Sequence, residues 1–165
     1  MADIQTVSIV VASAGVFLAA VYYILQLRHQ TKLRQTDLFM KLYSAWGSKR
    51  FRIAAKRFLA LEVENYDDFV KKHGPAASAE PSEIWLDIDM IGWFFNEIGF
   101  LVNEKLISEK SVRKILGYWV IKAWEKEKPL IYGWRREWGL PESFHWFEYL
   151  YNETKKEEPR GVRNG

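Results

Sequence analysis

The sequence contains no cysteine, and this absence excludes several classes of protein at once. Without thiols the chain has no disulfide scaffold, no cysteine-ligated zinc site and no cysteine nucleophile. Histidine is scarce, with 3 residues in 165. Glycine-rich phosphate loops, nucleophile-elbow motifs and zinc-protease motifs are missing from the sequence as well. We therefore predict a protein that is not an enzyme and that needs no cofactor.

Strand patterns, in which polar and apolar residues alternate, are lacking too, and no internal repeat is present. Apolar residues recur at helical spacing instead, which predicts an all-α fold. With 165 residues the chain has room for one ordinary domain. Hydrophobic residues make up 48% of the chain, which excludes disorder throughout its length.

One uncharged apolar stretch runs from Val7 to Leu27. Its 21 residues would measure roughly 31 Å as an α-helix, which matches a hydrocarbon core of about 30 Å. A buried core helix of this length would normally keep a polar face. A cleaved signal peptide would need basic residues before the stretch, where Asp3 is the one charged side chain. We predict a transmembrane helix over residues 7–27.

Basic residues follow the apolar stretch directly, namely Arg28, Lys32 and Arg34. An excess of Lys and Arg marks the cytoplasmic side of a membrane protein. The sequence therefore predicts a single-pass protein of the cell membrane, with residues 1–6 outside and the C-terminal body in the cytoplasm. The three cations are also predicted to contact lipid headgroups, because an anionic surface attracts them.

Four small residues within the apolar stretch share one helix face: Ser8, Ala12, Gly15 and Ala19. Such a stripe allows two helix backbones to approach closely, so it is a candidate for packing against another transmembrane helix. Ordinary lipid-facing composition explains the stripe equally well, and the sequence leaves both interpretations open.

The chain after residue 27 divides into three predicted parts. Residues 28–47 are polar at first and then regain an apolar face, which predicts a basic helical stalk. Residues 48–153 are predicted to form a compact cytoplasmic helical bundle. The charged end, residues 154–165, is predicted to be a disordered tail.

Cap residues and apolar spacing predict the helices of the bundle. The expected helices cover residues 49–61, 66–72, 83–105, 109–128, 129–138 and 142–152. Pro129 is expected to interrupt the chain between two of them. The helix over 83–105 is apolar around most of its surface and should be central. Gly92 and Gly99 share one face of it and predict close contact with a neighbouring helix.

Several short motifs occur in a fixed order along the chain. They are Trp46 with Ser48 and Phe51-Arg52, Asn65 to Phe69, Phe94 to Gly99, Leu106 to Ser108, Trp119, and Arg135-Arg136 before Phe147 to Leu150. This order resembles an uncharacterised family of small bacterial and archaeal proteins, over about residues 7–152. The resemblance implies one N-terminal membrane helix and a helical cytoplasmic body, and it implies no activity.

Positive charge is concentrated in residues 28–57, which hold nine Lys or Arg and one acid. Contact with anionic lipid is one interpretation, and it needs no special geometry. Phosphate contacts with nucleic acid are another, but no nucleic-acid-binding motif is present. We predict a topology signal combined with lipid contact, and no nucleic-acid partner.

One spacing points weakly towards a metal. Glu142 and His145 stand at i and i+3, as in carboxylate-bridged di-metal sites, and Glu97 could add a carboxylate. Such sites need two of these motifs and further glutamates, so we predict no metal site. The alternative for Glu97 is a buried ion pair with Arg135 or Arg136.

Aromatic residues make up 16% of the chain, including 8 Trp. Most of these rings should be core, because each buries a large apolar area. An exposed patch that binds a partner is the functional alternative. Trp134, Arg135, Arg136 and Trp138 are the predicted partner surface, since Trp and Arg are enriched at binding hot spots.

Together these features predict a membrane-anchored, non-enzymatic interaction or scaffold protein, such as an accessory subunit of a membrane complex. Its expected partners are membrane lipids and either another protein or a second copy of the chain. A sensor of anionic lipid surfaces is the first alternative. A carboxylate-metal enzyme built on Glu97, Glu142 and His145 is the second.

Overall fold

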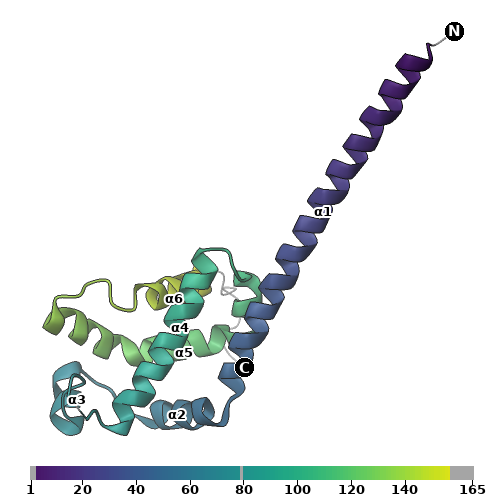
Figure 1. The fold of residues 1–165 in the computed structure, drawn as a ribbon. Coiled ribbons are helices and arrows are strands. Elements are labelled where there is room, and N and C mark those ends of the chain that lie inside the picture. Colours follow the sequence, from purple (N-terminus) through teal and green to yellow (C-terminus); the bar gives the residue numbers. More distant parts are fainter. Residues whose placement is uncertain (1–2, 79, 157–165) are drawn as a thin grey trace. The chain divides into compact units, whose positions relative to one another are not determined.

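The computed structural model describes residues 3–78 and 80–156, which form six helices and no strand. The helices are α1 (Ile4–Gly47), α2 (Lys49–Ala60), α3 (Tyr66–His73), α4 (Glu83–Asn103), α5 (Glu109–Trp138) and α6 (His145–Lys156) (Figure 1). The predicted all-α class is therefore confirmed. The chain divides into two compact units, the first ending at Leu38 and the second beginning at Phe39.

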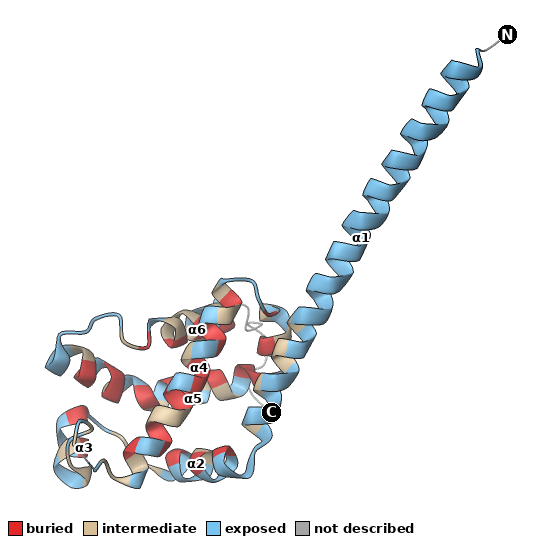
Figure 2. Cartoon of the chain, viewed as in Figure 1, coloured by how far each residue is buried: buried red, intermediate tan, exposed pale blue. Residues whose placement is uncertain are grey.

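The first unit contains α1 as far as Leu38, including its apolar stretch. Every side chain from residue 3 to residue 34 is exposed, as the uniform pale blue of this segment in Figure 2 shows. Within the described residues, this is the one helix long and apolar enough to cross a membrane. A candidate membrane helix at the N-terminus is thus present where the sequence predicts it.

Polar side chains within this apolar stretch find partners on their own helix. The Ser8 hydroxyl donates to the Ile4 carbonyl at 2.9 Å, and the Gln26 amide donates to the Tyr22 hydroxyl at 2.7 Å. Such local bonds matter in hydrocarbon, where no water is available to satisfy a polar group. They leave the outer surface of the stretch apolar.

The last turns of α1 belong to the second unit, the helical body. Trp46 packs its ring against Phe94 and Trp119, with centroids 5.7 and 5.4 Å apart. The body begins at Phe39, so it overlaps the second half of the predicted stalk of residues 28–47. The aromatic contacts of Trp46 account for this overlap. Ser48 then caps α2 by accepting a hydrogen bond from the Phe51 backbone at 3.2 Å.

Helix α4 is central to the body and packs against α2, α5 and α6 (Figures 1 and 2). Its side chains Trp85, Ile88 and Ile98 are completely buried. This confirms the prediction from its apolar surface. The observed bounds of α2, α3 and α4 agree with the predicted ones to within two residues.

Two glycines of α4 allow the close contacts that the sequence predicts, and each faces a different helix. A Cβ at Gly99 would stand 2.0 Å from the Trp146 carbonyl oxygen of α6. A Cβ at Gly92 would stand 2.2 Å from a carboxylate oxygen of Glu127 in α5. The absence of side chains at these two positions therefore sets how closely α5 and α6 approach α4.

The predicted interruption at Pro129 is wrong, since α5 is one helix of 30 residues that runs through it. Proline removes one backbone hydrogen bond and costs roughly 3 kcal/mol inside a helix. Packing on both sides offsets this cost, because Trp124, Leu130 and Ile131 are almost fully buried. The Lys126 ammonium also donates to the Leu59 and Leu61 carbonyls at the end of α2. Tertiary contacts thus hold the helix together across the proline.

The last helix is shifted towards the C-terminus relative to the predicted range of 142–152. Residues 141–144 form a turn, and α6 runs from His145 to Lys156. Thr154 lies within this helix, is buried, and donates to the Leu150 carbonyl at 2.7 Å. The predicted disorder of 154–165 is therefore wrong for residues 154–156. The remainder of that prediction lies outside the described residues.

Candidate functional site

An apolar groove opens on the helical body between the end of α1, helix α2 and helix α5. Its volume is about 400 Å³, within the range of small-molecule sites. Its lining residues are Tyr43, Trp46, Gly47, Phe51, Arg52, Ala55, Lys56, Leu59 and Trp119. We call it the aromatic groove, since four of the nine are aromatic.

Packing fixes the walls of the aromatic groove. The Trp46 ring lies 4.9 Å from the Phe51 ring and 5.4 Å from the Trp119 ring, measured between centroids. Phe51 is buried and is held at the first turn of α2 by the Ser48 cap. The walls are therefore formed before any ligand arrives.

A small apolar cleft adjoins the aromatic groove. The cleft has a volume of about 10 Å³ and shares five lining residues with the groove: Trp46, Phe51, Ala55, Leu59 and Trp119. Ala55 and Ala123 are small, which leaves this space between the larger rings. About one small chemical group fits there.

Two cations stand at the rim of the aromatic groove, Arg52 and Lys56. Both are exposed, and neither makes a hydrogen bond or ion pair through its side chain with another described residue. Arg57, the next residue along α2, contrasts with them, because its guanidinium lies 2.6 Å from the Asp87 carboxylate. No acidic residue lines the groove. The rim is therefore positive and uncompensated.

A second unusual feature is a carboxyl group buried without a partner. Glu127 of α5 is completely buried, and neither of its side-chain oxygens has a hydrogen-bond partner among the described residues. Burial, followed by repulsion from Asp89 of α4, raises the pKa of Glu127 well above its usual value. A pKa raised by burial favours the protonated, neutral form of the carboxyl group.

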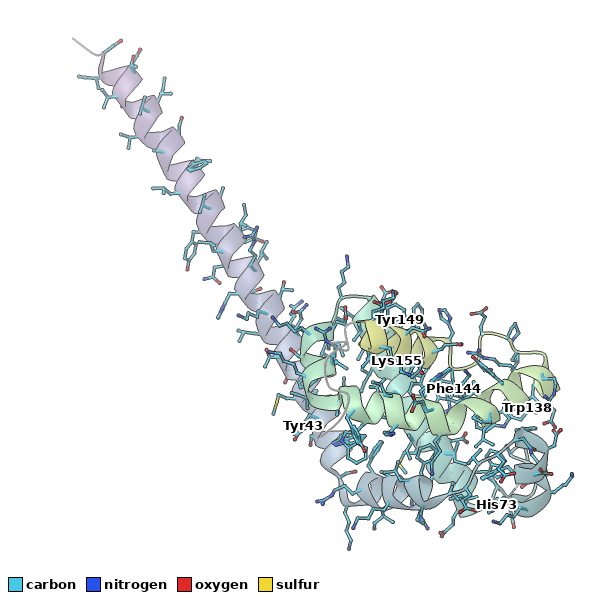
Figure 3. The ribbon with its side chains drawn as sticks, turned by 180° about the vertical axis from the view of Figure 1, so that it is seen from behind. Tyr43, His73, Trp138, Phe144, Tyr149 and Lys155 are labelled. Carbon is cyan, nitrogen blue, oxygen red and sulfur yellow. The ribbon has the colours of Figure 1, made fainter. Side chains whose placement is uncertain are left out.

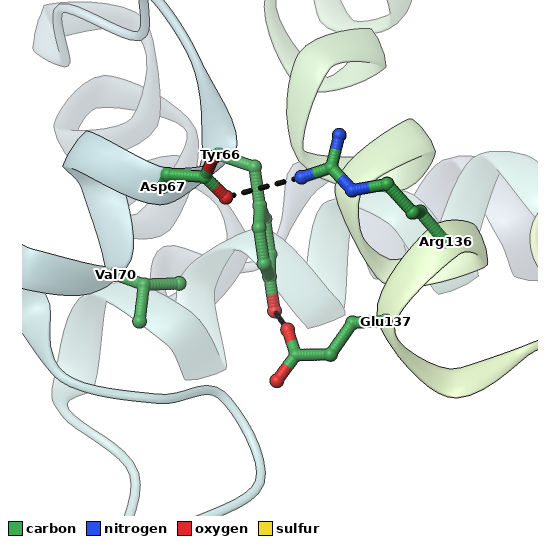
Figure 4. Close-up of a pocket in the computed structure, with 5 residues that line it drawn as sticks. All are labelled: Tyr66, Asp67, Val70, Arg136 and Glu137. Atoms are coloured by element: carbon green, nitrogen blue, oxygen red, sulfur yellow. Dashed lines mark hydrogen bonds and ion pairs between the residues drawn. The ribbon is translucent and has the colours of Figure 1, made fainter.

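A polar pocket of about 380 Å³ lies between α3 and α5, as Figure 4 shows. Its polar groups are already paired with each other. The Tyr66 hydroxyl donates to the Glu137 carboxylate, and the Arg136 guanidinium donates to Asp67 at 3.0 Å. Burial and the Glu137 bond raise the pKa of Tyr66. These pairs act as a clasp between α3 and α5.

The structure does not assemble the weak metal candidates. Within residues 3–78 and 80–156, no group of three or more Asp, Glu or His could hold a metal ion. Glu142 lies 3.5 Å from His145, and Glu97 is exposed on α4. The alternative of a buried Glu97 paired with Arg135 or Arg136 is wrong. It fails because that position of α4 faces outward.

The predicted partner surface divides into two halves. Trp134 is only 4% exposed, and Arg135 is held by Glu148 at 2.7 Å and by the Ser143 carbonyl. Trp134 therefore belongs to the core, and Arg135 is held by α6 and the turn before it. Arg136 and Trp138 are exposed. Figure 3 shows Tyr43 of the groove and Trp138 at opposite ends of the body, so the two regions are separate.

The residues predicted to serve in the membrane are all exposed on α1. Ser8, Ala12, Gly15 and Ala19 share one face, and nothing lies within 4 Å of a Cβ built at Gly15. The headgroup candidates Arg28, Lys32 and Arg34 form no ion pair with another described residue. Their roles stay predictions.

Comparison with protein families gives one result. Residues 9–154 match the profile of a domain of unknown function, DUF4760. The chain belongs to the DUF4760 family. This agrees with the resemblance noted from the motifs, since the family is one of unknown function and covers most of the chain. No curated protein and no solved structure matches the chain significantly.

Sequence reasoning missed two features of this DUF4760 chain. The aromatic groove depends on residues from three helices, and the one available signal was the i, i+4 pair of cations Arg52 and Lys56 on a helix with alanine between them. Glu127 stands among charged residues and resembles a solvated position. Its burial follows from the continuation of α5 through Pro129, which the sequence did not predict.

Proposed function

We propose that this DUF4760 protein is a membrane-anchored, non-enzymatic interaction protein. In this proposal, residues 7–27 cross the cell membrane once, residues 1–6 lie outside, and the helical body lies in the cytoplasm. The body binds another molecule and does not transform it. An accessory subunit of a membrane complex is the most specific form of the proposal.

The observation that carries the proposal is the exposed apolar surface of α1. From residue 7 to residue 27 no side chain is covered, and Phe17, Leu18 and Val16 are each more than half exposed. Burial of apolar surface contributes about 25 cal/mol per Å², so a stretch of this size is strongly unfavourable in water. A bilayer or a partner helix must therefore cover it.

The proposed topology can be tested by thiol labelling without background labelling of the chain, because the chain has no native cysteine. Thr6→Cys places a thiol before the apolar stretch, and Ala77→Cys places one in an exposed loop of the body. In intact cells a membrane-impermeant maleimide should label only the first variant. Labelling of both variants before lysis, or of the second alone, would overturn the orientation.

The partner can be sought by mild extraction of the full chain from its native membranes, followed by mass spectrometry of what co-purifies. Ala12→Leu enlarges the small-residue stripe, whereas Ala14→Leu makes the same change on another face of the helix. The proposal expects a stoichiometric partner, or a second copy, that is lost in Ala12→Leu and retained in Ala14→Leu. Equal recovery of the partner with both variants would show that the stripe takes no part in the interaction.

A sensor of anionic lipid is a second candidate function, favoured by the unpaired side chains of Arg28, Lys32 and Arg34. Each cation near an anionic surface contributes about 1 kcal/mol. Full-length protein in nanodiscs of mixed lipid should retain anionic lipid, and this enrichment should fall with salt and when the three residues become Gln. The matched control replaces three other exposed cations, Lys49, Lys72 and Lys122, by Gln. Equal loss in the control would overturn the assignment.

A further inference from the structure

We propose that the aromatic groove binds a single-chain amphiphile with an anionic head. The acyl chain lies along the aromatic walls with its end in the inner cleft, and the carboxylate or phosphate head meets Arg52 and Lys56. The site is distinct from the stripe and headgroup residues of α1. The inference rests on the proposed membrane location only for the source of the ligand.

The shape of the aromatic groove favours an alkyl chain over a bulkier occupant. The groove holds about 400 Å³ and adjoins an apolar cleft of about 10 Å³, whose lining includes the buried Phe58 and Phe95. A slender chain can lie along the groove and leave a terminal methyl group in the cleft. The flat face of a partner helix would cover the opening and leave the cleft empty, which forfeits packing contacts.

The charges at the rim of the groove select the head group. Arg52 and Lys56 stand four residues apart on α2, so they share one helix face. Both side chains lack partners within the part of the chain that the structure describes. An arginine and a lysine together suit a carboxylate or phosphate, which the arginine can bind through two parallel hydrogen bonds. A neutral or cationic amphiphile would leave both charges uncompensated.

Aromatic walls supply the remaining affinity. Tyr43, Trp46 and Trp119 each present part of a ring to the groove while the rest of the ring packs elsewhere in the body. Apolar burial is the main favourable term for a ligand of this kind. The rings need no reorganisation, because Trp46 is already wedged between Phe51 and Trp119.

Photo-crosslinking of the full chain tests the proposal. The protein is reconstituted in nanodiscs of zwitterionic lipid, and a fatty acid that carries a diazirine near the end of its chain is added. After illumination, peptides with adducts are mapped by mass spectrometry. We expect adducts on residues 43–59 and on the peptide containing Trp119, and we expect excess oleate to displace them.

Matched variants separate a charge-selective site from simple partitioning. Arg52→Glu with Lys56→Glu should lower the groove adducts by about tenfold or more, since each cation contributes on the order of a fivefold attraction. Arg50→Glu reverses an exposed charge on the same helix outside the groove and should leave the yield unchanged. Ala55→Trp should fill the groove and abolish the adducts. A diazirine fatty alcohol should label the groove far less than the acid.

Several outcomes would overturn the proposal. Adducts confined to residues 7–27 would show that the protein is inserted but that its groove takes no amphiphile. Equal labelling by acid and alcohol, or an equal loss in Arg50→Glu, would remove the charged recognition. If the full chain is purified from native membranes with another protein cross-linked to its groove residues, the groove binds a peptide partner instead. Absence of adducts on residues 7–27 would contradict the membrane anchor separately.

Discussion

Two carboxyl groups lie deep in the helical body, and the fold neutralises them in opposite ways. Asp87 of α4 is 1% exposed and meets the guanidinium of Arg57 at 2.6 Å. Glu127 of α5 is fully buried and has no partner among the described residues, and its raised pKa favours the protonated form in place of pairing with a cation. The difference shows that one small core can compensate a buried charge either by pairing or by protonation. Four changes sharpen this comparison.

Removal of the cation should have the largest effect. Arg57→Ala leaves Asp87 buried and uncompensated, and loss of one partner from a buried pair costs about 3–5 kcal/mol. Because Arg57 itself is 43% exposed, we expect a loss of stability at or below the lower end of this range. Thermal unfolding of the full chain in nanodiscs measures it. Arg52→Ala removes an unpaired arginine from the same helix, and an equal loss there would contradict the pairing.

Crowding of the buried Glu127 carboxyl group should have the second largest effect on stability. Gly92→Ala places a Cβ within 2.2 Å of the Glu127 carboxyl and 2.9 Å of the Phe144 ring, so the variant should lose about 1–3 kcal/mol. Glu127→Ala vacates the space and should rescue part of that loss in the double variant. Strict additivity in this double-mutant cycle would show that the two positions do not interact.

Titration distinguishes the two groups further. The folded state holds the Glu127 proton more tightly than the unfolded chain, whose glutamates titrate near pH 4.3. The contribution of Glu127 to stability is therefore fully present below about pH 4 and falls as pH rises towards the raised folded value. Between pH 5 and 8, the free energy of unfolding of Glu127→Gln should rise relative to that of the wild type by about 1 kcal/mol or more. A gap that stays flat with pH would contradict the raised pKa of Glu127.

The smallest effect should come from an ion pair that water can reach. Arg136 and Asp67 lie 3.0 Å apart, and each is about 70% exposed. Exposed pairs of this kind contribute about 0–1 kcal/mol, so Arg136→Ala should shift the unfolding temperature barely at all. A loss comparable to that of Arg57→Ala would mean that the clasp with Tyr66 and Glu137 acts as a cooperative network.

Local signals in the sequence predicted most of the helices. Ser48, Asn65 and Ser108 each cap the helix expected of them, because capping depends on residues within one turn. Pro129 was misjudged because its cost is local whereas the contacts that offset it come from other helices. The candidate site was the least predictable part. The aromatic groove depends on α1, α2 and α5 meeting, and the burial of Trp134 depends on which face of α5 turns inward.

The distribution of tryptophan gives the molecule a built-in optical reporter. Every one of the 8 Trp lies after residue 38, so the apolar stretch of α1 contributes no indole emission. Trp85 and Trp124 are buried, whereas Trp46 and Trp119 line the groove. Ultraviolet fluorescence of the intact chain in a bilayer therefore reports on the body alone. The wavelength of its emission maximum reports unfolding of the core. Quenching by a brominated lipid reports entry of that lipid into the groove.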